Sequence, residues 1–103
     1  MHAREILDVL DRAESFLKKL RYILRYYDIS LRTPSYSDDY LFSMWFKDTP
    51  IEFIDVMPDY VEVVLRDEYV NRECIPDEYR GEKYIKFRDM DELVSFLKQV
   101  LKC

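Results

Sequence analysis

Apolar residues recur every three or four positions through the first quarter of the chain, which is the spacing of a helix that buries one side. The stripe consists of Ile6, Leu10, Ala13, Leu17, Leu20, Leu24 and Tyr27. It predicts a helix from Ala3 to Tyr27, of about seven turns. Seven turns span ~38 Å, whereas the short strands predicted below cover only ~17–23 Å. Part of the stripe is therefore left for another partner, and we expect a homodimer.

Alternation of apolar and polar residues in the middle of the chain predicts β-strands, and clusters of Pro, Ser and Asp between them predict turns. The predicted strands are Tyr40–Phe46, Ile51–Val56, Tyr60–Arg66 and Tyr84–Arg88. The segment Asp28–Asp39 is predicted to be a loop, and Asp67–Lys83 a loop with at most a short helical turn. A second helix is predicted to start after Asp89, because Asp89 and Glu92 form a capping box in front of an apolar helical pattern.

These elements predict a two-layer α+β fold in the order α-β-β-β-β-α, in one domain that spans residues 1–103. We expect a mainly antiparallel sheet of about four strands, covered on one face by the two helices. The expected core comprises Leu10, Leu17, Leu20, Leu24, Phe42, Val61, Val63, Leu65, Ile85, Phe87, Leu93, Phe96, Leu97 and Val100. Strand alternation directs Phe42 and Met44 into this core. Trp45 then stands on the opposite face beside Leu41 and marks a contact surface there, unless the long loops cover that face as well.

The composition excludes several classes of catalytic site. Gly81 is the only glycine, so the chain has no P-loop, no dinucleotide-binding GxGxxG turn and no GxSxG nucleophile elbow. His2 is the only histidine, which excludes histidine-based triads and the usual zinc sites. Asp55, Asp59 and Glu62 cluster around one predicted turn, and the remaining enzyme hypothesis is a carboxylate–metal hydrolase in which Asp55 and Glu62 meet across a hairpin and hold Mg²⁺. Restriction-type nucleases need an acid-x-Lys pair, which is missing, so we expect a non-enzymatic protein without metal or cofactor.

Uncharged amide side chains are nearly absent, since Asn71 is the only asparagine and Gln99 the only glutamine, while 36% of the residues are charged. This bias is typical of hyperthermophiles and of their viruses and plasmids, and drift in a short chain is the alternative. No apolar run is long enough for a membrane span, and the first residues lack the pattern of a signal peptide, so we expect a cytoplasmic protein. Cys74 and Cys103 allow one disulfide, which hyperthermophiles tolerate inside the cell, but we expect both thiols to be reduced.

Charge is distributed unevenly along the chain, whose net charge is −5. Residues 34–82 carry four basic and thirteen acidic groups, a net of −9, whereas residues 1–33 and 83–103 each carry a net of +2. Two interpretations remain: the basic helices neutralise an acidic sheet, or the sheet and its loops present an acidic face to a basic protein. The second makes the chain a small acidic binding or inhibitor module. Its predicted binding residues are Asp38, Asp39, Trp45, Asp55, Asp59, Asp67, Glu68, Tyr69, Asp77 and Glu78.

A second hypothesis is nucleic-acid binding by the first helix, because basic residues alternate with tyrosines in its C-terminal half. Basic side chains contact phosphates, and tyrosine rings stack on bases. The residues concerned are Lys18, Lys19, Arg21, Tyr22 and Arg25. Cations in this half of a helix also favour its dipole, and the whole chain is acidic. We therefore rank nucleic-acid binding below protein binding.

Overall fold

The computed structural model describes residues 3–32 and 42–103, and the side chains of residues 3–10, 12, 13 and 17 fall outside that description. The elements are α1 (Ala3–Leu24), β1 (Ile29–Arg32), β2 (Phe42–Phe46), β3 (Ile51–Val56), β4 (Val61–Leu65), β5 (Tyr84–Phe87) and α2 (Met90–Val100). Two short 3-10 helices, η1 (Asp67–Tyr69) and η2 (Asp77–Tyr79), lie between β4 and β5. The predicted α+β class is confirmed, with five strands in place of about four.

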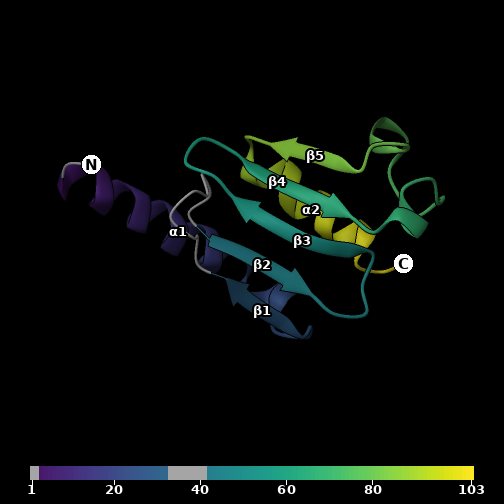
Figure 1. Cartoon of the computed structure of the whole chain (residues 1–103), viewed down its shortest axis with the longest axis horizontal. Helices are drawn as coiled ribbons and strands as arrows, with labels where there is room; N and C mark the ends of the chain where they lie inside the picture. Colours follow the sequence, from purple (N-terminus) through teal and green to yellow (C-terminus); the bar gives the residue numbers. More distant parts are fainter. Residues whose placement is uncertain (1–2, 33–41) are drawn as a thin grey trace.

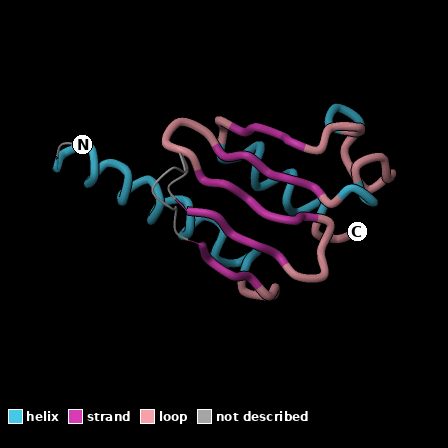
Figure 2. Tube along the Cα trace, in the orientation of Figure 1, coloured by secondary structure: helices cyan, strands magenta, loops and turns pink. Residues whose placement is uncertain are grey.

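Each strand pairs antiparallel with the next strand along the chain, so the sheet order is β1-β2-β3-β4-β5. Both helices lie behind the sheet in Figure 1, and Figure 2 shows the same two layers in cyan and magenta. The prediction that two helices cover one face of the sheet is therefore confirmed. Figure 1 also shows the first half of α1 extending beyond the sheet. The homodimer expected from the length of this helix stays a prediction.

Two boundaries near α1 differ from the prediction. The helix ends at Leu24, before the predicted Tyr27, and the amide of Tyr27 donates to the carbonyl of Leu24 at 3.1 Å, which closes the last turn. The segment predicted as a loop contains β1, which pairs with β2 so that Ile29 stands opposite Phe46. Four alternating residues are a weak signal in the sequence, and pairing with the neighbouring strand makes this segment a strand.

The core lies between the sheet and the two helices. Its buried members are Phe16, Leu20, Met44, Phe46, Ile51, Ile54, Val56, Val63, Leu65, Ile75, Ile85, Phe87, Leu93, Phe96, Leu97, Val100 and Leu101. Three predicted core residues, Leu24, Phe42 and Val61, are partly buried and pack against this cluster. The side chains of Leu10 and Leu17 lie outside the described residues.

Two groups of polar contacts fasten the ends of the elements. Arg66, at the end of β4, donates to the carbonyls of Phe46 at 2.6 Å and Thr49 at 2.8 Å, which ties β4 to the turn between β2 and β3. The hydroxyl of Tyr27 donates to the carbonyl of Leu101 at 3.4 Å and joins the end of α1 to the end of α2. The first contact fastens strands within the sheet, and the second fastens the two helices to each other within their own layer.

The second helix is fixed on both sides. Before its first residue, the carboxylate of Asp89 accepts a hydrogen bond from the amide of Asp91 at 2.9 Å, which confirms the predicted cap. After its last residue, Cys103 forms a disulfide with Cys74, whose Cα atom lies 5.7 Å away. The expectation of two reduced thiols is therefore wrong. It fails because α2 returns the chain to the loop between η1 and η2, where Cys74 lies, and nothing in the sequence shows this proximity.

Opening the Cys74–Cys103 bond is expected to destabilise the protein by about 3–4 kcal/mol, because the bond closes a loop of 29 residues in the unfolded chain. For a domain of this size, the melting temperature should fall by roughly 10 °C or more. The measurement is thermal unfolding by circular dichroism with and without a thiol reductant. The double variant Cys74→Ser, Cys103→Ser should melt at the lower temperature in both conditions. An unchanged midpoint on reduction of the native chain contradicts this contribution.

Candidate protein-binding face

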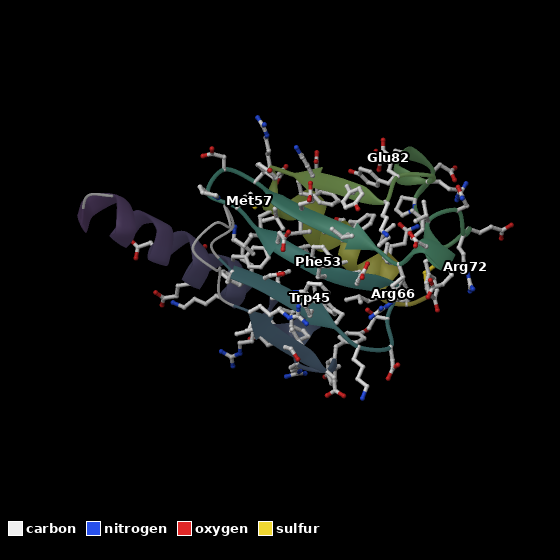
Figure 3. The ribbon with its side chains drawn as sticks, viewed as in Figure 1. Trp45, Phe53, Met57, Arg66, Arg72 and Glu82 are labelled. Atoms are coloured by element: carbon white, nitrogen blue, oxygen red, sulfur yellow. A yellow bond between two sulfur atoms is a disulfide. The ribbon has the colours of Figure 1, made fainter. Side chains whose placement is uncertain are left out.

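The sheet face turned away from α1 and α2 is formed by every second strand residue, and no helix of the described residues covers it. We call it the open face. Its strand residues are Ser30, Arg32, Ser43, Trp45, Phe53, Asp55, Glu62, Val64, Tyr84 and Lys86. Figure 3 shows Trp45 and Phe53 in front of the sheet on this face. Trp45 thus points where the sequence predicts, and its predicted neighbour Leu41 lies outside the described residues.

Strand pairing aligns the open face into two rows that cross all five strands. The first, which we call the apolar row, consists of Ser30, Trp45, Phe53, Val64 and Tyr84, each directly opposite the next. The second, which we call the charged row, consists of Arg32, Ser43, Asp55, Glu62 and Lys86 in the same order of strands. The rows are adjacent because their members are two residues apart on each strand.

Trp45 is held between two other side chains. Its indole stacks on the ring of Phe53, with centroids 4.4 Å apart and an interplanar angle of 23°. The guanidinium carbon of Arg32 lies 3.8 Å from the indole centroid. Because β1 and β3 flank β2, these two groups approach the indole from opposite sides. Trp45 is therefore a half-buried member of a stack and not a freely exposed side chain.

Val64 shows how the apolar row covers its own strands. The sequence places Val64 on the solvent face of its strand, and the structure confirms that it points away from the core cluster. It is nevertheless only 1% exposed. Its neighbours in the row, Phe53 and Tyr84, have large rings that flank it on both sides. The open face thus has a packed apolar centre of its own.

Asp55 and Glu62 stand directly opposite each other in the charged row. The Cβ atoms of such pairs are ~4.5–5.5 Å apart, and like charges at this distance destabilise a sheet. At one end of the row, the ammonium of Lys86 lies 4.9 Å from the ring centroid of Tyr60. At the other end of the row, the guanidinium of Arg32 lies over the indole ring of Trp45. In the described part of the chain the ion pairs are Lys18–Glu14, Arg80–Asp77 and Lys83–Asp67, so neither central carboxylate takes part in one.

The structure divides the predicted acidic residues between the two ends of the strands. Asp55 and Asp59 lie at the hairpin between β3 and β4. At the opposite end of β4 follow Asp67, Glu68, Asp77 and Glu78. Asp38 and Asp39 lie outside the described residues. The described acidic residues therefore do not form one continuous face, and of these Asp55 shares the open face with Trp45.

Two carboxylates beyond β4 have partners within the chain. The carboxylate of Asp67 accepts a hydrogen bond from the ammonium of Lys83 at 2.7 Å, which raises the pKa of Lys83. Asp77 pairs with Arg80 at 2.6 Å. The same arginine donates to the carbonyls of Arg72, Glu73 and Ile75. The guanidinium of Arg72 covers the nearby ring of Tyr69, at 4.4 Å from the ring centroid. These residues hold their loop together, which weakens their case as partner-binding groups.

The predicted nucleic-acid residues lie on the solvent side of α1, in the layer behind the sheet. Tyr22 is 65% exposed and Tyr26 is 72% exposed. The guanidinium of Arg25 lies 4.6 Å from the ring centroid of Tyr26 and donates to its hydroxyl, and that of Arg21 lies 5.5 Å from the ring of Tyr22. The neighbouring lysines, Lys18 and Lys19, are exposed as well. The helix thus presents exposed aromatic rings beside cations, as predicted.

The carboxylate–metal hydrolase has little to support it in the described residues. They contain no group of three His, Cys, Asp or Glu side chains that could hold a metal ion. A hollow of about 470 Å³ lies between α1, the β3–β4 hairpin and the start of α2. Its lining combines apolar side chains such as Phe16 with two acidic residues, Asp59 and Asp89, and with Arg88.

Comparison of the chain with protein-family models, with curated proteins and with solved structures gives no match. Within the described residues, no helix combines the length and the apolar character that a membrane span requires. Function is therefore inferred from the side chains of the open face and of α1.

Eight of the ten strand residues of the open face are missing from the sequence-based binding set, and for three of these eight the omission has a clear physical reason. Arg32 lies in β1, which the sequence does not identify as a strand. Phe53 follows a register irregularity between Ile51 and Phe53, so simple alternation from the start of β3 gives it the wrong side. Tyr84 is the first residue of β5, and alternation with the buried Ile85 is the signal that identifies it.

Replacing Asp55 by asparagine is expected to stabilise the free protein, because it removes the repulsion with Glu62 and breaks no ion pair. The gain should be about 0.2–1 kcal/mol, or roughly 1–5 °C in melting temperature, and should shrink in high salt. Glu82→Gln is the control, since it removes one negative charge from an exposed position outside the open face. A lower melting temperature for Asp55→Asn than for the native chain shows that the carboxylate is already compensated.

Tyr79 generates a prediction for alkaline pH. Its ring packs on Phe87 and Phe96, with centroids 5.4 and 5.3 Å away. Burial raises its pKa, and the nearby carboxylates of Glu78, Glu92 and Glu82 raise it further. In the unfolded chain the pKa returns to about 10, so the unfolded state releases its proton first, and the stabilisation present below this pH is lost above it. The native chain should therefore lose more stability than Tyr79→Phe between about pH 9.5 and 11. The prediction is contradicted if denaturation shows that the unfolding free energies of the two proteins fall by the same amount across this range.

Proposed function

We propose that this chain is a non-enzymatic protein-binding module and that a basic protein docks on its open face. The observation that carries the proposal is the apolar row beside two opposed carboxylates, on a sheet face that no described helix covers. Aromatic side chains surrounded by polar groups are typical energetic centres of protein interfaces. Tyr84, which is 61% exposed, and the half-buried Trp45 and Phe53 supply such a centre.

The charge distribution supports a basic partner. The chain carries a net charge of −5, and most of its acidic groups lie in residues 34–82. Those that the structure describes lie on the open face or at the two ends of its strands. A negative potential around the face attracts a basic protein, increases the rate of association and makes that rate fall as salt rises.

An inhibitor is the simplest role for such a module, because it acts by occupying the surface of its partner. We propose a cytoplasmic protein of a hyperthermophile or of its virus or plasmid, an origin that the composition favours and with which the disulfide is compatible. Those organisms keep disulfides inside the cell, and charged residues in place of amides suit high temperature.

Two tyrosines provide a matched test of the binding surface. Tyr84 on the open face is 61% exposed, and Tyr26 in the turn that follows α1 is 72% exposed. Ligands are selected from a displayed library of random peptides in low salt, and their dissociation constants are measured for the native chain, Tyr84→Ala and Tyr26→Ala. Selected ligands should be basic and should bind Tyr84→Ala about tenfold more weakly, as for an aromatic residue at an interface centre. Their affinity for Tyr26→Ala should be unchanged.

The opposite pattern favours the second candidate function, nucleic-acid binding by α1. The specific observation for it is the pair of exposed rings, Tyr22 and Tyr26, with guanidinium groups beside them. Single-stranded DNA and RNA oligonucleotides are the probes. Salt-sensitive binding that is lost in Tyr26→Ala and kept in Tyr84→Ala replaces the proposed function with this one. If the selected ligands bind Tyr84→Ala and Tyr26→Ala as tightly as they bind the native chain, the open-face proposal is contradicted.

A further inference from the structure

The centre of the charged row offers a place for one cation. Asp55 and Glu62 lie directly opposite each other on β3, the central strand of the sheet, and on β4 next to it. Both side chains are half-buried. Carboxylates this close interact more strongly when they are partly withdrawn from water. A positive group between them removes their repulsion.

The described residues do not supply this cation. Arg32 and Lys86, the two basic residues of the row, are each engaged with an aromatic ring, at 3.8 Å and 4.9 Å from the ring centroids. Neither makes an ion pair with the central carboxylates, as the ion pairs of the described residues show. The positive group must therefore come from outside the described part of the chain.

A second and independent observation marks the same row as incomplete. Ser43 stands between Arg32 and Asp55 in the register, and it is 1% exposed. Among the described residues its hydroxyl has no hydrogen-bond partner, and neither has the buried Nε1 of Trp45, two positions along the same strand. Buried polar atoms are usually paired, and leaving them unpaired costs free energy. One of these two residues, Ser43, stands directly opposite Asp55 in the charged row.

We propose that the partner places an arginine between Asp55 and Glu62. This inference rests on the proposed function and names the chemistry of its partner. A guanidinium group is planar and carries five N–H donors, so it can bond two carboxylates at once, which a lysine ammonium does with less geometric fit. A single metal ion is disfavoured, because no third His, Cys, Asp or Glu side chain of the described residues joins the two carboxylates in a group that could hold one.

The apolar row defines what stands next to that arginine. On each strand the two rows are two residues apart, which is about 7 Å along an extended chain. An extended segment of the partner that runs along the strands has the same spacing between alternate side chains. An apolar residue two positions from the arginine therefore falls on the Trp45–Phe53 stack. The recognised segment is an arginine with an apolar side chain at the second position before or after it.

Trp45 reports directly on this site, because it is the only tryptophan in the chain. The probe is the peptide leucine–alanine–arginine–alanine–leucine, blocked at both ends and titrated in low salt while tryptophan emission is recorded. Two further peptides carry lysine or the neutral isostere citrulline in place of arginine. The arginine peptide should bind best, the lysine peptide more weakly, and the citrulline peptide about tenfold more weakly than arginine, as expected for a lost charge-assisted hydrogen bond.

Matched variants separate the arginine site from the rest of the face. Asp55→Asn and Glu82→Gln each remove one negative charge, and Glu82 lies outside the open face (Figure 3). Binding of the arginine peptide should weaken about tenfold in Asp55→Asn and stay unchanged in Glu82→Gln. Binding of the arginine peptide to Tyr84→Ala is measured in the same way, as the test of the open face outside the arginine site.

The outcomes distinguish the two proposals. If citrulline binds as well as arginine, or Asp55→Asn binds as well as the native chain, the arginine site is wrong. If binding in that case is still lost in Tyr84→Ala, the open face remains the binding surface. If binding survives in both Asp55→Asn and Tyr84→Ala, the site and the proposed function fail together. If no peptide alters the emission up to about 10 mM, an affinity too weak for recognition, the arginine site is again wrong.

Discussion

The packing of both helices on one side of a five-stranded sheet is the constraint on which the other features depend. Leu20 of α1 and Phe96 and Leu97 of α2 are almost fully buried against that side. Burial of apolar surface is the main stabilising contribution to a fold of this size. Once it is achieved on one side, strand alternation sends every second residue to a side that no described helix protects.

On the unprotected side, the long basic side chains lie over aromatic rings. The carboxylates of that side are therefore left without ion-pair partners among the described residues. A cation over an aromatic ring at an exposed site is worth about 0.5–1 kcal/mol, and an exposed ion pair about 0.2–1 kcal/mol. The two contacts are of similar strength, so Arg32 gives up little by lying over Trp45. As a result, the electrostatic repulsion between the opposed carboxylates of Asp55 and Glu62 remains. A face arranged in this way is stable enough to fold and still gains when a positive group arrives.

Periodic features were predictable from the sequence, and features that depend on contacts between distant residues were not. The strand Ile51–Val56 has the bounds that its composition predicts, and Asp89 caps α2 as its spacing from Glu92 indicates. The strand β1 has only four residues, so its identity is decided by its pairing with β2. Ile75 is fully buried in a loop without any periodic pattern around it. The position of Trp45 followed from alternation, but the stack around it required the register of three strands.

The disulfide constrains the chain at one edge of the sheet and leaves the chain at the other edge without such a constraint. Residues 74–103 form a closed ring of chain that contains β5 and α2, so the edge strand β5 cannot separate from the sheet without moving the loop that carries Cys74. At the other edge, β1 has four residues and no covalent fastening of this kind. Local opening therefore costs more free energy at the β5 edge than at the β1 edge. Amide hydrogens should exchange with solvent in that order, with those of β1 released long before those of β5 and α2.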